Sequence, residues 1–336
     1  MKAFVLFLSL MVCAACSTPA PSDAPLGRYG GPPLADPADF DRASIDVIRG
    51  TFAAGRQPDG NSVILSSANG LIVFDTGRHT AHTQKIVDLA HARGQPVAAI
   101  INSHWHLDHI SGNILLRKMW PGAAVYSNDA ALTEALDSFL KRGLEANRKM
   151  LADPATTGGL AEDLRADIAT VEQGDRLHPT ISVASARDIM IGGRDLQLHA
   201  ANGASAGDVW LYDPAARLAA TGDLITLPAP FLDTACPAMW RLALDDILAT
   251  PFVRAVPGHG REMTRADVTL YRDAFNALID CAIGAAASDT CARAWASSIA
   301  TLLDDQSGDA GQAIAYAGYY VENILRPHAF RADCIT

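Results

Sequence analysis

The sequence predicts an α/β protein in which helices cover the faces of sheets. Short β-rich runs and longer runs with helical periodicity follow one another along the chain, without an internal repeat or a low-complexity tract. The composition is that of a globular protein, since 49% of the 336 residues are hydrophobic and 19% are charged. The net charge of −10 disfavours nucleic acid and anionic lipid as partners.

Residues 1–16 are expected to form a signal peptide. Lys2 precedes an apolar run over 4–16, which is shorter than the roughly 20 residues that span a bilayer. The run ends in Cys13-Ala14-Ala15-Cys16, which resembles a bacterial lipobox, in which Cys16 would be acylated and become the first mature residue. Residues 17–44, rich in Pro, Gly, Ala and Asp, would then be a flexible tether. We expect an exported, periplasmic lipoprotein that meets the membrane only through this anchor, or alternatively a simply cleaved periplasmic protein.

The folded domain is expected over 45–285. Its first half should supply a hairpin, a helix that stops at Gly94 and a strand, over 62–66 with 71–74, 80–93 and 97–101. Residues 111–173 are expected to be a mainly helical insertion, most regular over 130–150 and broken over 154–159.

The second half of the domain should begin with strands and end with helices. Strands are predicted over 189–191, 196–200, 209–212 and 218–221. Helices are predicted over 242–249, 265–285, 292–303 and 313–325. Residues 286–336 are then a C-terminal helical extension packed on the domain.

Four cysteines remain after removal of the signal peptide, and an even number in an exported protein suggests disulfides. Three pairings are possible. We favour Cys281 with Cys291, because this pair closes a short loop between two helical stretches. Cys236 would then pair with Cys334, while buried free thiols are the alternative.

A dense cluster of metal-binding residue types follows the strand expected over 97–101. His104, His106, Asp108 and His109 lie within six residues of one another. Neutral imidazoles and a carboxylate are the ligands that zinc prefers, and a loop at a strand end can present them together. The cluster predicts a zinc site, with iron or manganese left open as the metal.

This pattern, His-x-His-x-Asp-His, resembles the signature of the metallo-beta-lactamase superfamily, and the resemblance extends over roughly residues 45–270. Segments 71–77, 219–223 and 256–260 are similar to further motifs of that family, in the same order. The resemblance implies a four-layer αββα sandwich of two mixed sheets flanked by helices. It also implies a metal-dependent hydrolase, without fixing the substrate.

The resemblance assigns the ligands residue by residue. His104 and His106 would hold a first metal, Asp108, His109 and His259 a second, and Asp223 would bridge them. Asp75 would orient a ligand imidazole, or merely cap its strand. The family's third histidine of the first site is replaced by Ala204. We therefore expect one firmly bound metal and one labile metal, unless His199 or Asn202 completes the first site.

The expected reaction is hydrolysis of a small-molecule substrate by a zinc-activated water that Asp108 orients. An ester, lactone, amide or beta-lactam bond would be cleaved. A beta-lactam is the less favoured substrate, because beta-lactamases usually have Cys or Ser at the position of Asp223. The helical insertion and the loop 227–240, with Phe231, Met239 and Trp240, should border the site. Oligomeric state is open.

Two alternatives remain. Residues 203–207 match the Gly-x-Ser-x-Gly turn of serine hydrolases, with Ser205 as nucleophile, Asp233 or Asp245 as acid and His259 as base. Against this, the residues after Ser205 predict a strand instead of the required helix. The other alternative is a non-catalytic metal-binding lipoprotein of the same fold.

Overall fold

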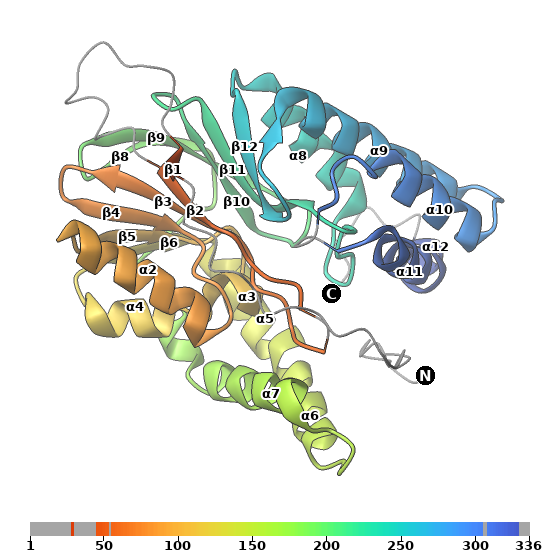
Figure 1. The fold of residues 1–336 in the computed structure, drawn as a ribbon, viewed down its shortest axis with the longest axis horizontal. Coiled ribbons are helices and arrows are strands. Elements are labelled where there is room, and N and C mark those ends of the chain that lie inside the picture. Colours follow the sequence, from red (N-terminus) through yellow and green to blue (C-terminus); the bar gives the residue numbers. More distant parts are fainter. Residues whose placement is uncertain (1–27, 30–44, 54, 305–307, 329–336) are drawn as a thin grey trace.

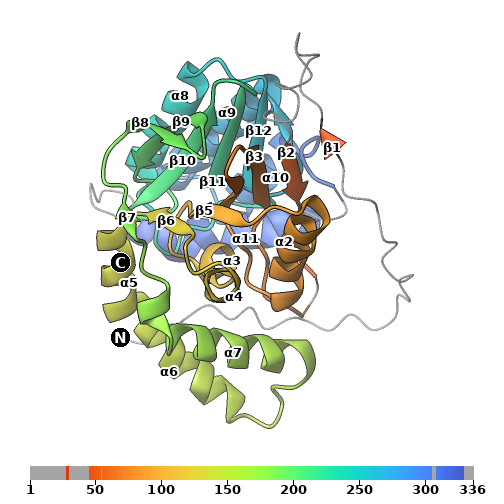
Figure 2. The ribbon, with the colours of Figure 1, turned by 90° about the vertical axis from the view of Figure 1, so that its left-hand side faces the viewer.

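The computed structural model describes residues 28–29, 45–53, 55–304 and 308–328. Two sheets pack face to face, and helices cover both outer faces (Figure 1). The view turned by 90° shows α2 and α4 outside the first sheet, and α8 and α9 outside the second (Figure 2). The predicted four-layer αββα sandwich is confirmed. Cys16 and almost all of 17–44 lie outside the described residues, so the lipid anchor and the tether stay predictions.

The first sheet contains seven described strands in sequence order, antiparallel up to β4 and parallel from there on. The predicted hairpin is confirmed as β3 and β4, and the predicted strand over 97–101 is β5. The strands are β1 (Arg28–Tyr29), β2 (Ile45–Ile48), β3 (Ser62–Ser67), β4 (Gly70–Phe74), β5 (Val97–Ile101), β6 (Ala124–Ser127) and β7 (Ile181–Ser182).

The second sheet contains six described strands in the order β13-β12-β11-β10-β9-β8. Only β11 and β12 pair in parallel. The strand expected to end at Thr221 continues to Thr226, which corrects the prediction, because a register shift around Gly222 lets pairing with β12 resume. The strands are β8 (Arg187–Ile191), β9 (Arg194–Ala201), β10 (Asp208–Asp213), β11 (Leu218–Thr226), β12 (Arg254–His259) and β13 (Met263–Thr264).

Alternating side chains on the strands separate the layers. In β4, Ile72 and Phe74 enter the core between the sheets, whereas Leu71 and Val73 face the helix layer that contains Ile86. Successive strand residues point to opposite faces, so a run buried on both sides is uniformly apolar. Each such side chain contributes roughly 1.5–3 kcal/mol of burial free energy, which makes both interfaces of the sheet stabilising.

The region 111–173 differs from the expected helical insertion. Residues 124–127 form β6, which pairs in parallel with β5 and so belongs to the first sheet. The expected helix over 130–150 is divided at Ser138, whose backbone is not helical. The helices are α2 (Thr80–Arg93), α3 (Leu107–Ile110), α4 (Asn113–Met119), α5 (Asp129–Asp137), α6 (Phe139–Leu151), α7 (Gly158–Val171) and the 3-10 turn η1 (Gly174–Arg176). Both ribbon views show α6 and α7 projecting as a pair from the sandwich (Figures 1 and 2).

The C-terminal helices pack on the outer face of the second sheet. They share one apolar core with that sheet, to which Trp210, Trp240 and Trp295 contribute fully buried rings. Capping boxes begin two of them, at Thr264 and Asp309. The helices are α8 (Pro237–Ala249), α9 (Arg265–Ile283), α10 (Ser288–Ser298), α11 (Ala310–Tyr320), the π-helical turn η2 (Val321–Leu325) and α12 (Arg326–His328).

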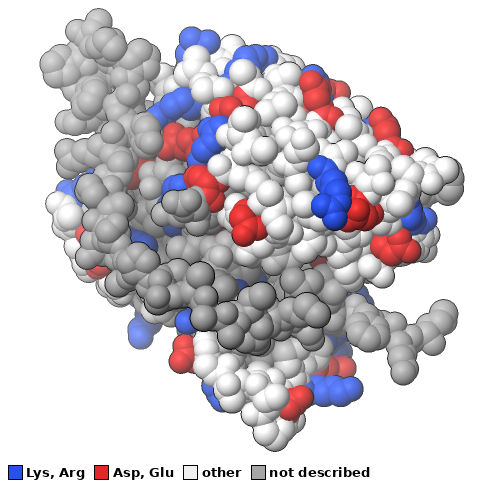
Figure 3. Space-filling model, turned by 45° about the vertical axis from the view of Figure 1, so that its right-hand side comes forward, with Lys and Arg blue, Asp and Glu red and all other residues white. Residues whose placement is uncertain are grey.

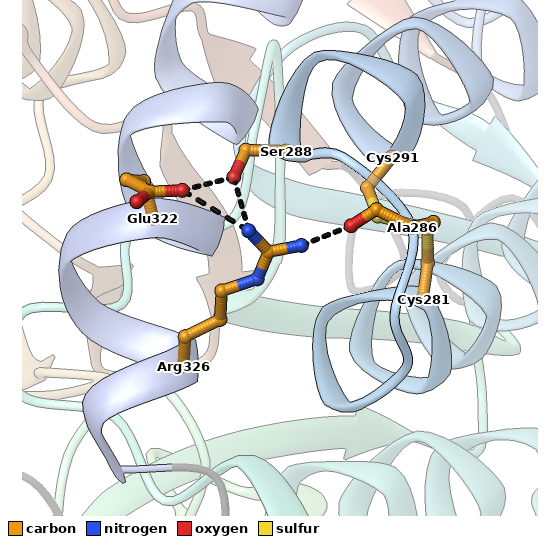
Figure 4. Close-up of a disulfide and its surroundings, with 6 residues drawn as sticks. All are labelled: Cys281, Ala286, Ser288, Cys291, Glu322 and Arg326. Atoms are coloured by element: carbon orange, nitrogen blue, oxygen red, sulfur yellow. Dashed lines mark hydrogen bonds and ion pairs between the residues drawn. A yellow bond between two sulfur atoms is a disulfide. The ribbon is translucent and has the colours of Figure 1, made fainter.

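A disulfide joins α9 to α10, as the sequence predicts for Cys281 and Cys291. Close to it, Arg326 donates to Ser288 Oγ at 2.8 Å and to the carbonyl oxygen of Ala286 (Figure 4). Covalent and polar contacts therefore fix the last helices against the domain. Cys334 lies outside the described residues, so its pairing with Cys236 stays a prediction.

The described helices and surface show two general features. None of those helices combines the length and the apolar character needed to cross a membrane. On the face shown in Figure 3, acidic and basic side chains are scattered among uncharged ones without one dominant patch.

Candidate metal centre

The predicted ligands lie where the ends of several strands meet. Asp75 follows β4, and the loop between β5 and α3 contains His104 and His106. Helix α3 carries Asp108 and His109. Residues far apart in sequence therefore meet because β4, β5, β11 and β12 all end or bend at this edge of the sandwich.

The structure gathers the six predicted ligands into two adjacent groups. In each group, the candidate ligand atoms lie within 4.8 Å of one another. The first group is His104, His106 and Asp223, and the second is Asp108, His109 and His259. Asp223 faces both groups, because its Oδ2 lies 3.8 Å from His104 Nε2 and its Oδ1 lies 3.2 Å from His109 Nε2. His259 Nε2 lies 3.0 Å from Asp108 Oδ2.

Two glycines allow this convergence. Gly222 has a φ of 52°, and a Cβ there would lie 2.3 Å from the Cβ of Ser103. A Cβ on Gly258 would lie 2.0 Å from Asp223 Oδ1. Only glycine fits at these positions, so β11 and β12 can approach the motif loop closely enough to deliver Asp223 and His259.

Asp75 lies next to the ligand groups and orients a ligand imidazole by hydrogen bonding, as the sequence suggests. Its carboxylate accepts hydrogen bonds from the backbone N–H of Ser103 at 2.7 Å and from Ser103 Oγ at 2.7 Å. It also accepts one from His109 Nδ1 at 2.8 Å. Because a carboxylate only accepts, the Nδ1 of His109 carries a proton, and its Nε2, which faces Asp223, is the atom left to bind a metal.

The same reasoning fixes the tautomer of His104. Ser103 gives its single hydroxyl proton to Asp75, so the contact of 2.9 Å between Ser103 Oγ and His104 Nδ1 must be donated by the imidazole. The lone pair of His104 is then on Nε2, the atom nearest Asp223. One buried carboxylate therefore orients a ligand in each group.

His106 is oriented by a residue that the sequence did not indicate. Thr234 Oγ1 donates to the carbonyl oxygen of Ala204 at 3.0 Å and lies 2.9 Å from His106 Nε2. Since the threonine proton is committed to that carbonyl, His106 must donate from Nε2 and present a bare Nδ1. A lone threonine in a loop carries no recognisable sequence signal.

The buried polar atoms of the centre fit a bound cation. Within the described part of the chain, Nε2 of His104, His109 and His259 and both carboxylate oxygens of Asp223 are buried without a hydrogen-bond partner. Buried polar atoms are rarely left unpaired, because each then loses its hydration without compensation. Imidazole lone pairs and carboxylate oxygens that converge in this way match the donor set of a divalent metal.

The protonation states agree with this fit. Burial, together with the neighbouring imidazoles, lowers the pKa of His104 well below its ordinary value. Burial lowers the pKa of His106 to about 4. Both rings are therefore neutral at physiological pH, which is the form that binds metal.

The second group carries excess negative charge. Burial alone raises the pKa of Asp108, but two imidazoles and the guanidinium of Arg78 hold that pKa well below its usual range. Burial also opposes protonation of His109, yet the three surrounding carboxylates raise the pKa of its imidazole well above the ordinary value. The carboxylates that favour a proton on His109 would equally favour a metal cation, which would displace the proton from Nε2 on binding.

Arg78 links the centre to the projecting helices. Its Nη1 donates to both carboxylate oxygens of Asp167 in α7, at 2.6 and 2.7 Å. Its Nη2 lies 3.6 Å from Asp108 Oδ1, and its side chain is only 11% exposed. Arg78 directly follows the Asp75–Gly77 turn, but no local sequence pattern indicates its two acidic partners.

The substituted position of the first group is not compensated in the structure. Ala204 is fully buried and offers no ligand atom. His199 stacks on Trp210 with ring centroids 3.9 Å apart, and the side-chain amide of Asn202 lies about 3 Å from the carbonyl oxygens of Ala201 and Ala206. Neither side chain joins a ligand group, so the structure does not support the alternative in which one of them completes the first site. His199 lies on the helix-facing side of the sheet, and the amide of Asn202 lies against carbonyl oxygens of its own loop.

The serine hydrolase alternative is also wrong. Ser205 is buried, and its hydroxyl donates to Asp208 Oδ1 at 2.9 Å. The strand β10 follows, in place of the helix that a nucleophile elbow requires. Asp233 accepts from Tyr320, and Asp245 pairs with Arg272, so neither orients His259.

The predicted borders of the site are partly confirmed. Phe231 lies against His259 with ring centroids 5.7 Å apart. Trp240, by contrast, is fully buried and donates Nε1 to the carbonyl oxygen of Leu224, so its role is packing. Met239 lies on the exposed side of α8.

A comparison with known families decides the family of the chain. The profile described as "Metallo-beta-lactamase superfamily" matches residues 55–287. The chain belongs to the metallo-beta-lactamase superfamily. Metal ions, usually zinc, are generally bound by this superfamily, and the two ligand groups described above can hold them.

Solved structures with TM-scores above 0.5 share the fold of this superfamily member. The DIM-1 metallo-beta-lactamase is 11% identical with a TM-score of 0.51, covering 74% of this chain and 97% of its own. The stereoselective inverting sec-alkylsulfatase Pisa1 from Pseudomonas sp. is 15% identical with a TM-score of 0.54, covering 81% of this chain. The match spans 48% of Pisa1, about half its length. A metallo-beta-lactamase from Pontibacter korlensis is 19% identical with a TM-score of 0.48, covering 67% of this chain and 91% of its own.

Proposed function

We propose that this protein is an exported, metal-dependent hydrolase that cleaves an ester, lactone, amide or beta-lactam bond. The observation that carries the proposal is the convergence of unpartnered, buried imidazole nitrogens and carboxylate oxygens on one point, in a superfamily of hydrolase-type fold. Zinc bound there would lower the pKa of a water to about 7 and polarise the scissile carbonyl. Iron and manganese use similar ligands.

Residues around the metal centre would orient the ligand imidazoles and the attacking water. Asp75 and Thr234 hold the three motif imidazoles in the tautomers that bind metal. Asp108 stays anionic because its pKa is strongly lowered, so its carboxylate can accept a hydrogen bond from the attacking water and aim it. Arg78 restrains that carboxylate from the other side.

The two metal positions should differ in affinity. Ala204 leaves the first position with His104, His106 and the shared Asp223, whereas the second has three ligands of its own besides Asp223. We propose one firm and one labile metal. Loss of an outer partner already costs about 10–100-fold in affinity, so a missing imidazole should weaken the first position at least as much.

The test combines metal content with turnover. Purified protein is analysed for metal and assayed on activated esters, lactones, amides and beta-lactams, before and after chelation and zinc addition. We expect turnover that chelation abolishes and zinc restores. His259→Ala should remove the firm metal and His106→Ala only the labile one. Retained activity in metal-free protein would overturn the metal-dependent mechanism. No turnover at any zinc level would overturn the hydrolase proposal and leave a non-catalytic metal-binding protein.

We also propose that the protein is exported and carries a lipid anchor. Both proposals rest on the charged start, the short apolar run and the lipobox-like end at Cys16. A Cys16→Ser variant should lose membrane association in fractionated cells yet still be exported. Equal membrane association of both forms would contradict acylation at this cysteine.

A further inference from the structure

A cluster of three aromatic side chains lies beside the second ligand group. Phe231 lies edge-on to His259, with a centroid distance of 5.7 Å. It also contacts Phe52 and Tyr316, each with a centroid distance of 6.4 Å, and these two rings lie 5.8 Å apart. We call Phe52, Phe231 and Tyr316 the aromatic cluster.

The cluster is assembled from distant parts of the chain. Phe52 follows β2, Phe231 follows β11, and Tyr316 lies on α11 in the C-terminal helices. All three side chains are half-buried, unlike the tryptophans of the core behind them. Partly exposed rings held against a reactive centre offer an apolar surface to a molecule bound there.

A second aromatic pair lies beside the first ligand group. Trp105 contacts His106 with centroids 4.5 Å apart and Phe139 of α6 with centroids 5.3 Å apart. His106 is the one predicted ligand of intermediate exposure, whereas the other five are buried. Aromatic rings therefore lie beside a ligand of each group, His106 in the first and His259 in the second.

The arginines on the segment that carries Phe52 are already paired with carboxylates. Among the described residues 49–79, which include Phe52, Arg49 pairs with Asp304 at 2.9 Å and Arg56 pairs with Asp163. Arg78 is held by Asp167. A substrate carboxylate would find no unpaired arginine on this segment, and recognition of an anion depends on such a partner.

We propose that the aromatic cluster binds an uncharged aryl or alkyl group of the substrate, so that the substrate class is neutral esters and lactones with a bulky apolar group. This inference rests on the proposed hydrolase function and narrows it. It predicts that anionic beta-lactams are poorer substrates than neutral esters.

The kinetic test compares substrates that differ only in the acyl group. For zinc-loaded protein, the ratio of kcat/KM for 4-nitrophenyl phenylacetate to that for 4-nitrophenyl acetate is measured. We expect Phe231→Ala and Tyr316→Ala to lower this ratio about tenfold or more, the usual effect of lost apolar contact on specificity. Phe231→Leu, a milder change, should lower it less. Tyr319→Ala, an aromatic deletion on the same helix outside the cluster, should leave the ratio unchanged.

A binding test separates this inference from the proposed function. Binding of acetophenone and of benzoate to zinc-loaded protein is followed by saturation-transfer NMR. Acetophenone binding that Phe231→Leu and Tyr316→Ala weaken supports the inference, even if no substrate is turned over. A wild-type ratio in active variants, or tighter binding of benzoate than of acetophenone, would overturn it while leaving hydrolysis intact.

Discussion

Replacing Asp75 by Asn should reverse the proton arrangement behind the metal centre without removing a hydrogen bond. The backbone N–H of Ser103 cannot turn away, so the amide oxygen of the new side chain should remain opposite it. The amide NH2 then faces Ser103 Oγ and His109 Nδ1, the two groups that donate to Asp75 in the wild type. Asn also tolerates the positive φ of 60° at this position.

The consequence is a change of tautomer in both ligand groups. His109 would accept at Nδ1 and carry its proton on Nε2, the atom that faces Asp223. The hydroxyl of Ser103, released from Asp75, could then donate to His104 Nδ1, which moves that ring's proton to Nε2 as well. Loss of such an orienting partner costs about 10–100-fold in metal affinity. This range corresponds to about 1.4–2.8 kcal/mol at each position.

The assay is a zinc titration by calorimetry or by competition with a chromophoric chelator. Chemical denaturation of the metal-free protein is measured in parallel and should give a stability close to the wild type, because every hydrogen bond has a replacement. Asp46→Asn is the matched control. Asp46, on β2, is equally buried but pairs with Arg93 at the end of α2, so its loss should lower stability and leave zinc affinity unchanged.

Two results would refute the reasoning. If Asp75→Asn bound zinc within about threefold of the wild type, the carboxylate would not set the ligand tautomers. If Asp46→Asn weakened zinc binding as much as Asp75→Asn, the effect would reflect general destabilisation.

Three further predictions concern stability. Burial lowers the pKa of His82 to about 4, so the unfolded chain takes up a proton near pH 6.5 that the folded chain takes up only near pH 4, and the folded state loses stability as the pH falls through this window. His82→Gln should remove about 3 kcal/mol of that loss, measured by denaturant unfolding of the metal-free protein. A pH profile identical to that of the wild type would contradict this prediction. Arg78→Met should destabilise the protein by about 3–5 kcal/mol, because the carboxylate of Asp167 is left buried and unpaired. Adding Asp167→Leu should restore most of the lost stability, and a double variant no more stable than the single variant would contradict this. Cys281 and Cys291 are separated by 10 positions, and replacing both with Ser should lower the free energy of unfolding by about 3 kcal/mol, because the unfolded chain loses its closed loop. The denaturation midpoint should fall while the zinc content stays unchanged. A changed zinc content would contradict the prediction, because the disulfide would then affect the metal centre.

The fold could be predicted from sequence wherever the signal is local. The helix over 80–93 was predicted with its boundaries, because its periodicity is regular and Gly94 takes the left-handed conformation that ends it. The strand β6 was missed, because four residues between helical runs carry almost no periodicity. Its conformation depends on pairing with β5, which is a tertiary contact.

The candidate site likewise contains residues that local sequence predicts and a residue that it does not. His104, His106, Asp108 and His109 are close in sequence, and a loop that ends a strand keeps them close in space. Nothing local indicates that Thr234 lies against His106, since 128 positions separate them.

The sequence by itself determined the kind of chemistry. The residue types of the motif and the substitution at Ala204 follow from covalent structure alone, because a side chain carries its donor atoms into any fold. Only the tertiary structure decided which nitrogen of each imidazole faces the metal position and which aromatic rings lie beside it. Those properties depend on hydrogen bonds and contacts of a few ångströms between segments that only packing of the two sheets brings together.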